Sequence, residues 1–64
     1  MNTARLQIQY IDGSPSKVMS LPELLDCQIW SAYNRERLER LCRGQIRRFM
    51  TSIRGKDAEI ERVT

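Results

Sequence analysis

The tetrapeptide Ser20-Leu21-Pro22-Glu23 constrains the fold of this chain more than any other short segment. The Ser20 hydroxyl can accept a hydrogen bond from the backbone N–H of Glu23, and the Glu23 carboxylate can reach back to the N–H of Ser20. Pro22 falls in the first helical turn, where its missing N–H removes no hydrogen bond. A helix is therefore predicted to begin near Leu21, and we expect it to occupy residues 21–33.

The predicted helix over 21–33 has one apolar face with helical spacing. This face is formed by Leu21, Leu24, Leu25, Ile29 and Ala32. Trp30 projects to the opposite side, so either the helix ends before about Gln28 or Trp30 meets a different surface. Asn34 suits a break, because it tolerates the left-handed conformation at a helix end and can also cap a new helix.

The segment before the capping box reads as a hairpin over residues 5–20. Leu6, Ile8 and Tyr10 alternate with Gln7 and Gln9, and this period of two is typical of a strand with one buried face. The next five residues, 12–16, all favour turns. Residues 17–20 can then return as a short second strand. Since a lone hairpin is not stable in water, its apolar face must pack on other elements.

Residues 35–54 carry the longest helical pattern. Its apolar stripe consists of Leu38, Cys42, Ile46, Phe49 and Ile53. Gly55 suits the C-terminal cap of this helix, whereas Gly44 interrupts it and can instead divide the segment into two shorter helices. The acidic tail at 56–64 is weakly patterned, and its Ile60 and Val63 fit either a helical turn or an extra edge strand.

Together these elements predict a single small α+β domain over 1–64. An N-terminal β-hairpin packs on two α-helices, of which the second is long and Arg-rich. A chain of 64 residues buries only about 60% of its unfolded surface, which excludes a second domain and a deep enclosed cavity and favours a homodimer. The order of residues 17–21 and two helices is similar to that of ribbon–helix–helix repressors, which implies strand pairing across a dimer.

The composition argues against catalysis, cofactors and metals. The chain has no His, and its two cysteines, Cys27 and Cys42, form no CxxC pair. We expect both to be small buried apolar residues in a reducing compartment, with a Cys27–Cys42 disulfide as the lesser alternative. No serine has a His to activate it, so we expect a non-enzymatic protein. No apolar run approaches the ~20 residues of a membrane span, and we expect a cytoplasmic protein.

Positive charge is concentrated in the predicted second helix. Residues 35–54 contain seven Arg and two Glu, a net charge of +5, whereas the rest of the chain has four basic and six acidic residues, a net charge of −2. On a helical wheel, Arg40, Arg43, Arg47 and Arg54 flank the apolar stripe, with Arg48 at its margin. The planar guanidinium suits phosphate and stacks on bases. The pattern therefore predicts nucleic-acid binding at these arginines.

Two aromatic residues extend this candidate site. Trp30 and Tyr33 lie beside the arginines in sequence and can contribute stacking or packing. A second interpretation uses the same residues on an acidic surface of a host protein, as a small inhibitor or adaptor of the phage or plasmid accessory type. A third leaves the arginines as a solvated face paired with Glu36, Glu39 or the acidic tail.

Short motifs resemble two further families. Leu6–Gly13, then Leu21-Pro22, then Ile46-Arg47 resembles the strand, turn-Gly, strand, Val-Pro, helix, Ile-Arg order of KTSC domains, small modules sometimes attached to lysyl-tRNA synthetases. Ile8–Gly13 and Arg47–Phe49 resemble WYL domains, which are ligand-binding regulatory modules with an Arg-x-Phe strand. The two resemblances imply different folds, and no site residue is carried over from either.

Overall fold

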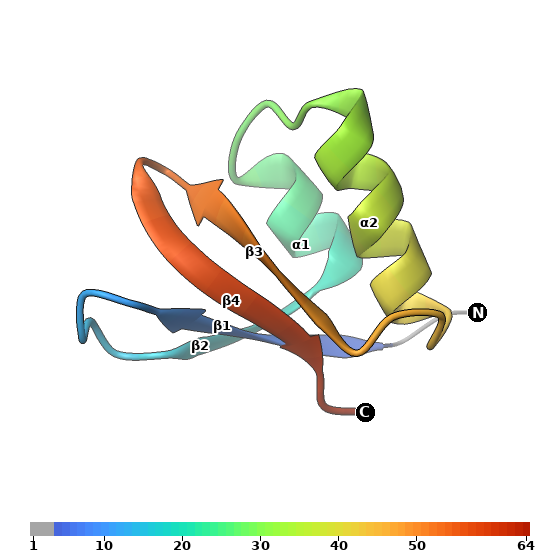
Figure 1. Ribbon diagram of the computed structural model, residues 1–64, viewed down its shortest axis with the longest axis horizontal. Helices are drawn as coiled ribbons and strands as arrows, with labels where there is room; N and C mark the ends of the chain where they lie inside the picture. The colour runs from blue at the N-terminus through green and yellow to red at the C-terminus, as the bar shows by residue number, and fades with distance from the viewer. Residues whose placement is uncertain (1–3) are drawn as a thin grey trace.

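A four-stranded antiparallel sheet carries both helices on one face (Figure 1). The structure is a computed structural model that describes residues 4–64. Its elements, in chain order, are β1 (Arg5–Tyr10), β2 (Lys17–Ser20), α1 (Leu21–Asp26), α2 (Ala32–Cys42), β3 (Arg48–Ile53) and β4 (Lys56–Arg62). The strand order is β2-β1-β4-β3, with every neighbouring pair antiparallel. The predicted α+β class is therefore confirmed.

The N-terminal hairpin forms, but it is only half of the sheet. Leu6 and Ile8 of β1 are fully buried, whereas Lys17 and Val18 of β2 are exposed on an edge strand. The second neighbour of β1 is β4, with Ile8 opposite Ile60. The apolar face of β1 thus packs in the core beneath the helices as part of a four-stranded sheet, so the predicted packing of a separate hairpin on the helices is supported only in part.

The capping box starts α1 as predicted. The Glu23 N–H donates to Ser20 Oγ over 3.3 Å, and the Ser20 N–H donates to Glu23 Oε1 over 3.0 Å. The prediction that this helix continues to residue 33 is wrong, because α1 ends at Asp26. Trp30 Nε1 donates to the Leu24 carbonyl oxygen over 2.9 Å, so the chain turns back over the end of the helix. Ile29, expected in the core, is consequently 99% exposed.

The predicted helix over 35–54 is also wrong. α2 begins at Ala32, where Ser31 Oγ accepts a hydrogen bond from the Asn34 N–H over 3.2 Å, and it ends at Cys42. Gly44 follows with φ +75°, a left-handed conformation that stops the helix. The long Arg-rich helix therefore does not form.

The second half of that predicted helix is strand β3, and the predicted tail is strand β4. Phe49 and Ile53 are buried with Thr51 between them, while Arg48, Met50 and Ser52 are exposed, which is the alternation of a strand. Since residues four apart share a face in both a helix and a strand, the Phe49–Ile53 spacing alone does not separate the two. β4 pairs with both β1 and β3, so the tail is an inner strand and neither an edge strand nor a helical turn.

A two-residue turn joins β3 to β4. Its residues, Arg54 and Gly55, have φ values of +52° and +85°. Positive φ at both central positions is the signature of a type I′ turn, whose twist matches that of a hairpin. Gly55 is therefore a turn residue and not the predicted helix cap.

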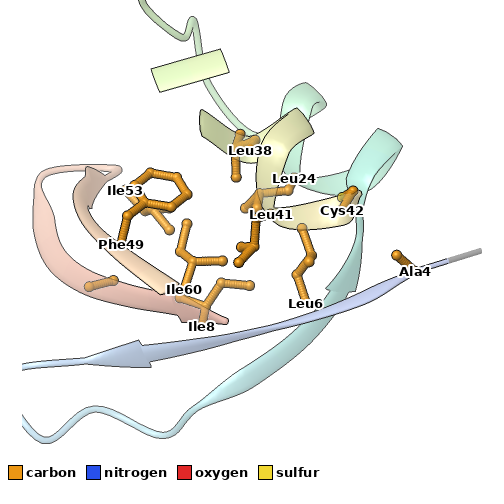
Figure 2. Packing of buried hydrophobic residues seen from close by; sticks show 11 residues of the cluster. Ala4, Leu6, Ile8, Leu24, Leu38, Leu41, Cys42, Phe49, Ile53 and Ile60 are labelled. Carbon is orange, nitrogen blue, oxygen red and sulfur yellow. The ribbon is translucent and has the colours of Figure 1, made fainter. Parts of the chain in front are cut away.

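The core lies between the two helices and the face of the sheet beneath them (Figure 2). Its buried residues are Ala4, Leu6, Ile8, Leu24, Leu38, Leu41, Cys42, Phe49, Ile53, Ala58 and Ile60. Ile46, expected in the core, is half-buried in the loop between α2 and β3. The opposite face of the sheet, which we call the open face, carries no helix among residues 4–64.

Candidate functional site

The structure separates the predicted site residues into several places. Arg40 lies in α2, Arg43 caps its C-terminus and Arg47 lies in the following loop. Arg54 lies in the β3–β4 turn, at the other end of β4, which is about 20 Å long. The predicted stripe of Arg40, Arg43, Arg47 and Arg54 along one helix therefore does not exist, and only its first three members stay near one another.

Arg62, which the sequence placed in an acidic tail, joins the end of α2. Its Nη1 donates to the Cys42 carbonyl oxygen over 2.9 Å, and its Nε donates to the Thr64 carbonyl oxygen over 2.8 Å. A Cβ added to Gly44 would lie 3.7 Å from Arg62 Nη1. Arg47 and Arg62 line the same open hollow, together with Gly44. Helix cap, loop and last strand thus bring together Arg43, Arg47 and Arg62, which we call the arginine cluster.

Among the described residues, no Asp or Glu side chain lies within 4.0 Å of a guanidinium nitrogen of the arginine cluster. All three are exposed. Their neighbours differ: Arg40 pairs with Glu36 at 3.4 Å and Arg48 pairs with Glu59 at 3.7 Å. The partial negative charge of the α2 C-terminus attracts these guanidinium groups but neutralises them only in part.

The acidic side chains next to this region belong mainly to the open face. Asp57, Glu59 and Glu61 alternate along β4 on that face, and Glu61 also reaches the rim of the hollow beside Arg62. Arg48 extends from the neighbouring strand β3 on the same face, opposite Glu61. The open face therefore has an acidic row at its centre, whereas the arginine cluster lies at the end of α2.

The two predicted aromatic residues differ in exposure. Trp30 is half-buried against the core, and its indole N–H is already bonded to Leu24, so its contribution is packing. Tyr33 is 69% exposed at the start of α2. Its hydroxyl accepts a hydrogen bond from Arg37 Nη1 over 3.2 Å, and the Arg37 guanidinium lies 5.4 Å from the Tyr33 ring centroid and 5.2 Å from that of Phe49.

The prediction overlooked Arg37 and Arg62. Arg37 could have been found from its i,i+4 spacing to Tyr33, which places both side chains on one helix face. Arg62 had no such local signal, because its partner Cys42 lies 20 residues earlier in the chain. Only the strand register brings the two together.

The cysteines are both free thiols. Cys27 Sγ donates to the Leu24 carbonyl oxygen over 3.0 Å, and Cys42 is buried in the core. Burial raises the pKa of the Cys42 thiol, with smaller opposing effects from Arg62 and Arg43. Within residues 4–64, the acidic and cysteine side chains form no group of three arranged to hold a metal ion. Neither described helix has the length and apolarity to span a bilayer.

Comparison with protein-family models, with curated proteins and with solved structures finds no match to this chain. The short motifs resembling KTSC domains, WYL domains and ribbon–helix–helix repressors therefore have no family match behind them.

Proposed function

We propose that this protein is a non-enzymatic binding protein that holds nucleic acid by its phosphate backbone at the arginine cluster. The observation that carries the proposal is that Arg43, Arg47 and Arg62 lie together at the end of α2, exposed and without an Asp or Glu partner among the described residues. Arg forms short, charge-assisted hydrogen bonds with phosphate oxygens in a planar fork geometry. Arg40, one helical turn before Arg43, extends the same surface.

The surrounding charges support a backbone-directed mode of binding. The outer side of α2 carries Glu36 and Glu39 among its arginines, so this helix is poorly suited to lie deep in a groove of DNA. The acidic row on the open face repels a polyanion from the other side of the sheet. We therefore expect contacts at the loop end of α2, with affinity that depends strongly on salt and little on base sequence.

Salt dependence and a charge-matched pair of variants test this proposal. Fluorescence anisotropy with labelled single-stranded and double-stranded oligonucleotides is measured at about 50 and 200 mM salt. Three phosphate contacts predict a loss of affinity of about tenfold or more between the two conditions. Arg43→Ala with Arg47→Ala removes two of these contacts and flattens the salt dependence.

The control variant combines Arg5→Ala with Arg35→Ala. It lowers the net charge by the same amount, from +3 to +1, but both residues lie outside the arginine cluster. We expect it to keep most of the affinity and the slope of the wild-type protein. Absence of binding at the lower salt, or an equal loss in both double variants, would contradict the proposal.

A second candidate function is binding to a protein, and one observation favours it. Ile29 is 99% exposed three residues before α2, and Tyr33, which is 69% exposed in the first turn of α2, accepts a hydrogen bond from Arg37. Exposed apolar and aromatic side chains next to arginine are typical of binding hot spots. This surface is about 15 Å from the arginine cluster along α2, so it can be tested separately.

The test of this second candidate is a pull-down from nuclease-treated lysate. If the surface at Ile29 and Tyr33 binds a protein, the double variant Ile29→Ser with Tyr33→Ser no longer captures a defined partner. The double variant Arg43→Ala with Arg47→Ala still captures it. If capture is lost only in the arginine double variant, the surface at Ile29 is excluded as the protein-binding site.

A further inference from the structure

A second cationic hollow lies at the opposite end of the molecule from the arginine cluster. Figure 1 shows the β1–β2 loop and the β3–β4 turn at one end of the sheet, beyond the helices, while the loop after α2 lies at the other end. The hollow lies between the β1–β2 loop and the β3–β4 turn. Its lining residues are Tyr10, Ser14, Pro15, Lys17, Ile53, Arg54 and Lys56. It opens on the helix-bearing face, since Lys17 lies opposite Ile8 and Lys56 opposite Ile53 in the sheet register.

Three cations from different segments surround this hollow. Lys56 Nζ donates to Ser14 Oγ over 3.2 Å and lies 5.6 Å from the centroid of the Tyr10 ring, which fixes its position. Lys17 and the guanidinium of Arg54 have no ion-pair partner within the part of the chain that the structure describes. One acidic group opposes them: Asp12 Oδ2 lies 3.7 Å from Lys56 Nζ. A positive excess remains at Lys17 and Arg54.

Arg54 occupies its position at a cost in backbone strain. Its φ of +52° is a conformation that residues with a Cβ rarely adopt, and Asn or Gly is the usual first residue of such a turn. Gln28 supports the turn, because its Oε1 accepts from the Arg54 N–H over 2.6 Å and its Nε2 donates to the Ser52 carbonyl oxygen over 3.1 Å. An arginine kept in a strained conformation at the rim of a hollow indicates a role for its side chain.

The wall between these cations is largely apolar. Tyr10 and Pro15 provide its accessible part, whereas Ile53 beneath them is 1% exposed and belongs to the core. A hollow with an apolar wall and convergent cations is suited to a ligand that has both a flat, weakly polar part and an anionic group. A phosphate monoester can bond to several cations at once, which a neutral ligand cannot.

We propose that this hollow binds a nucleoside monophosphate. Lys17, Arg54 and Lys56 hold the phosphate, and the nucleoside lies against Tyr10 and Pro15. This site goes beyond the proposed nucleic-acid surface, because it lies a full strand length from the arginine cluster and shares no residue with it. The ligand can be a free mononucleotide or the 5′-terminal nucleotide of a strand, since both present the same monoester.

The test is a titration of the ¹⁵N-labelled full chain with adenosine monophosphate, followed by its amide resonances. We expect shifts at Gly13, Gly55 and Lys56 that saturate at about millimolar concentration, with binding by adenosine and by inorganic phosphate at least about tenfold weaker. A 5′-phosphorylated oligonucleotide that shifts the same amides at lower concentration assigns the site to strand ends. If the oligonucleotide gives weaker shifts than adenosine monophosphate, the site is assigned to the free mononucleotide. No saturable shift at these amides with either ligand overturns the proposal.

The matched variant is Lys17→Gln combined with Arg54→Asn. Asn is well suited to the first position of the turn, so the charge is removed while the hairpin geometry is kept. We expect about a tenfold loss of mononucleotide affinity in this variant and none in Arg43→Ala with Arg47→Ala. The reverse pattern overturns the pocket proposal and leaves the arginine cluster intact as the nucleic-acid surface. A native-like amide spectrum of each variant shows that the fold is preserved.

Discussion

The two hairpins of the sheet reach similar geometries by different means. β1 and β2 are joined by the six residues 11–16, and the hairpin places a short strand, β2, at the edge of the sheet. β3 and β4 are joined by two residues only, and β4 lies between two neighbours. The first hairpin is specified by its own alternation and turn residues. The second has no such local signal and has an unusual turn conformation at Arg54, while the β1–β4 pairing links both hairpins to the same sheet.

The sharpest test of this difference is a pair of truncations, one in each hairpin. Ile60 in β4 is fully buried between Ile8 and Phe49, so Ile60→Ala removes core contacts and is expected to cost about 3–4 kcal/mol. Val18 in β2 is 45% exposed on an edge strand, and Val18→Ala is expected to cost less than about 1 kcal/mol. Urea unfolding measures both free energies. Equal costs would contradict the sheet order.

The second comparison concerns one glycine in each connection. Gly55 has φ +85° within the two-residue turn, where Gly55→Ala strains the backbone at a cost of about 1–2 kcal/mol. Gly13 has φ +86° in the longer connection, and an added Cβ meets nothing within 4 Å at either glycine, so the two positions differ only in the length of the connection. Since that connection has more residues over which to relax, Gly13→Ala is expected to cost less than Gly55→Ala in the same unfolding measurement. A larger cost at Gly13 would show that the first turn is the more rigid one.

The same contrast explains how much of the molecule the sequence could predict. The capping box at Ser20 involves residues three apart, so its hydrogen bonds are visible in a short window. The β3–β4 hairpin has no such signal, because Phe49 and Ile53 fit a helical stripe as well as a strand face. The Arg54-Gly55 pair is a turn only if Arg adopts a positive φ, which is rare for it.

The candidate site, like the fold, was predictable only where its residues are close together in the sequence. Arg43 and Arg47 were identified as cationic site residues from their helical spacing, and they stay at the same end of the molecule because α2 ends just before them. Arg54 was assigned to the wrong end of the molecule, since strand β3 carries it away from α2. Arg62 required the long-range pairing of β4, on which no local pattern reports.

The capping box between β2 and α1 makes a further prediction of moderate size. Ser20→Ala removes the hydroxyl that accepts the Glu23 N–H, at an expected cost of about 1 kcal/mol. The pKa of Glu23 is lowered, first by the hydrogen bond from the Ser20 backbone N–H and then by the Ser20 side chain. A lowered pKa in the folded state means that the carboxylate stabilises the fold at pH values above its ordinary 4.5 and that this contribution is lost as the pH falls below it.

Glu23→Gln separates the charge from the hydrogen bond. The amide oxygen of Gln can still accept from the Ser20 N–H, so the helix start is kept, but the acid-induced loss of stability becomes smaller than in the wild-type protein. Thermal unfolding followed from neutral pH to below 4.5 measures this difference. Identical pH profiles for the two proteins would show that the Glu23 carboxylate has the same pKa in the folded and unfolded chain.

The smallest expected effect is a gain in stability, and it lies in the β3–β4 turn. Arg54→Asn relieves the left-handed strain because Asn adopts positive φ more readily. The hydrogen bond from the backbone N–H of residue 54 to Gln28 Oε1 is kept, because it does not involve the side chain of residue 54. We expect about 0.5 kcal/mol of added stability by urea unfolding, at the expense of the cation that Arg54 contributes to the hollow. Gln28→Ala, which leaves Arg54 in place without its support, should destabilise the same turn by about 1 kcal/mol. A loss of stability in Arg54→Asn would mean that the Arg54 side chain stabilises the fold itself, and the strain at this position would then no longer indicate a ligand.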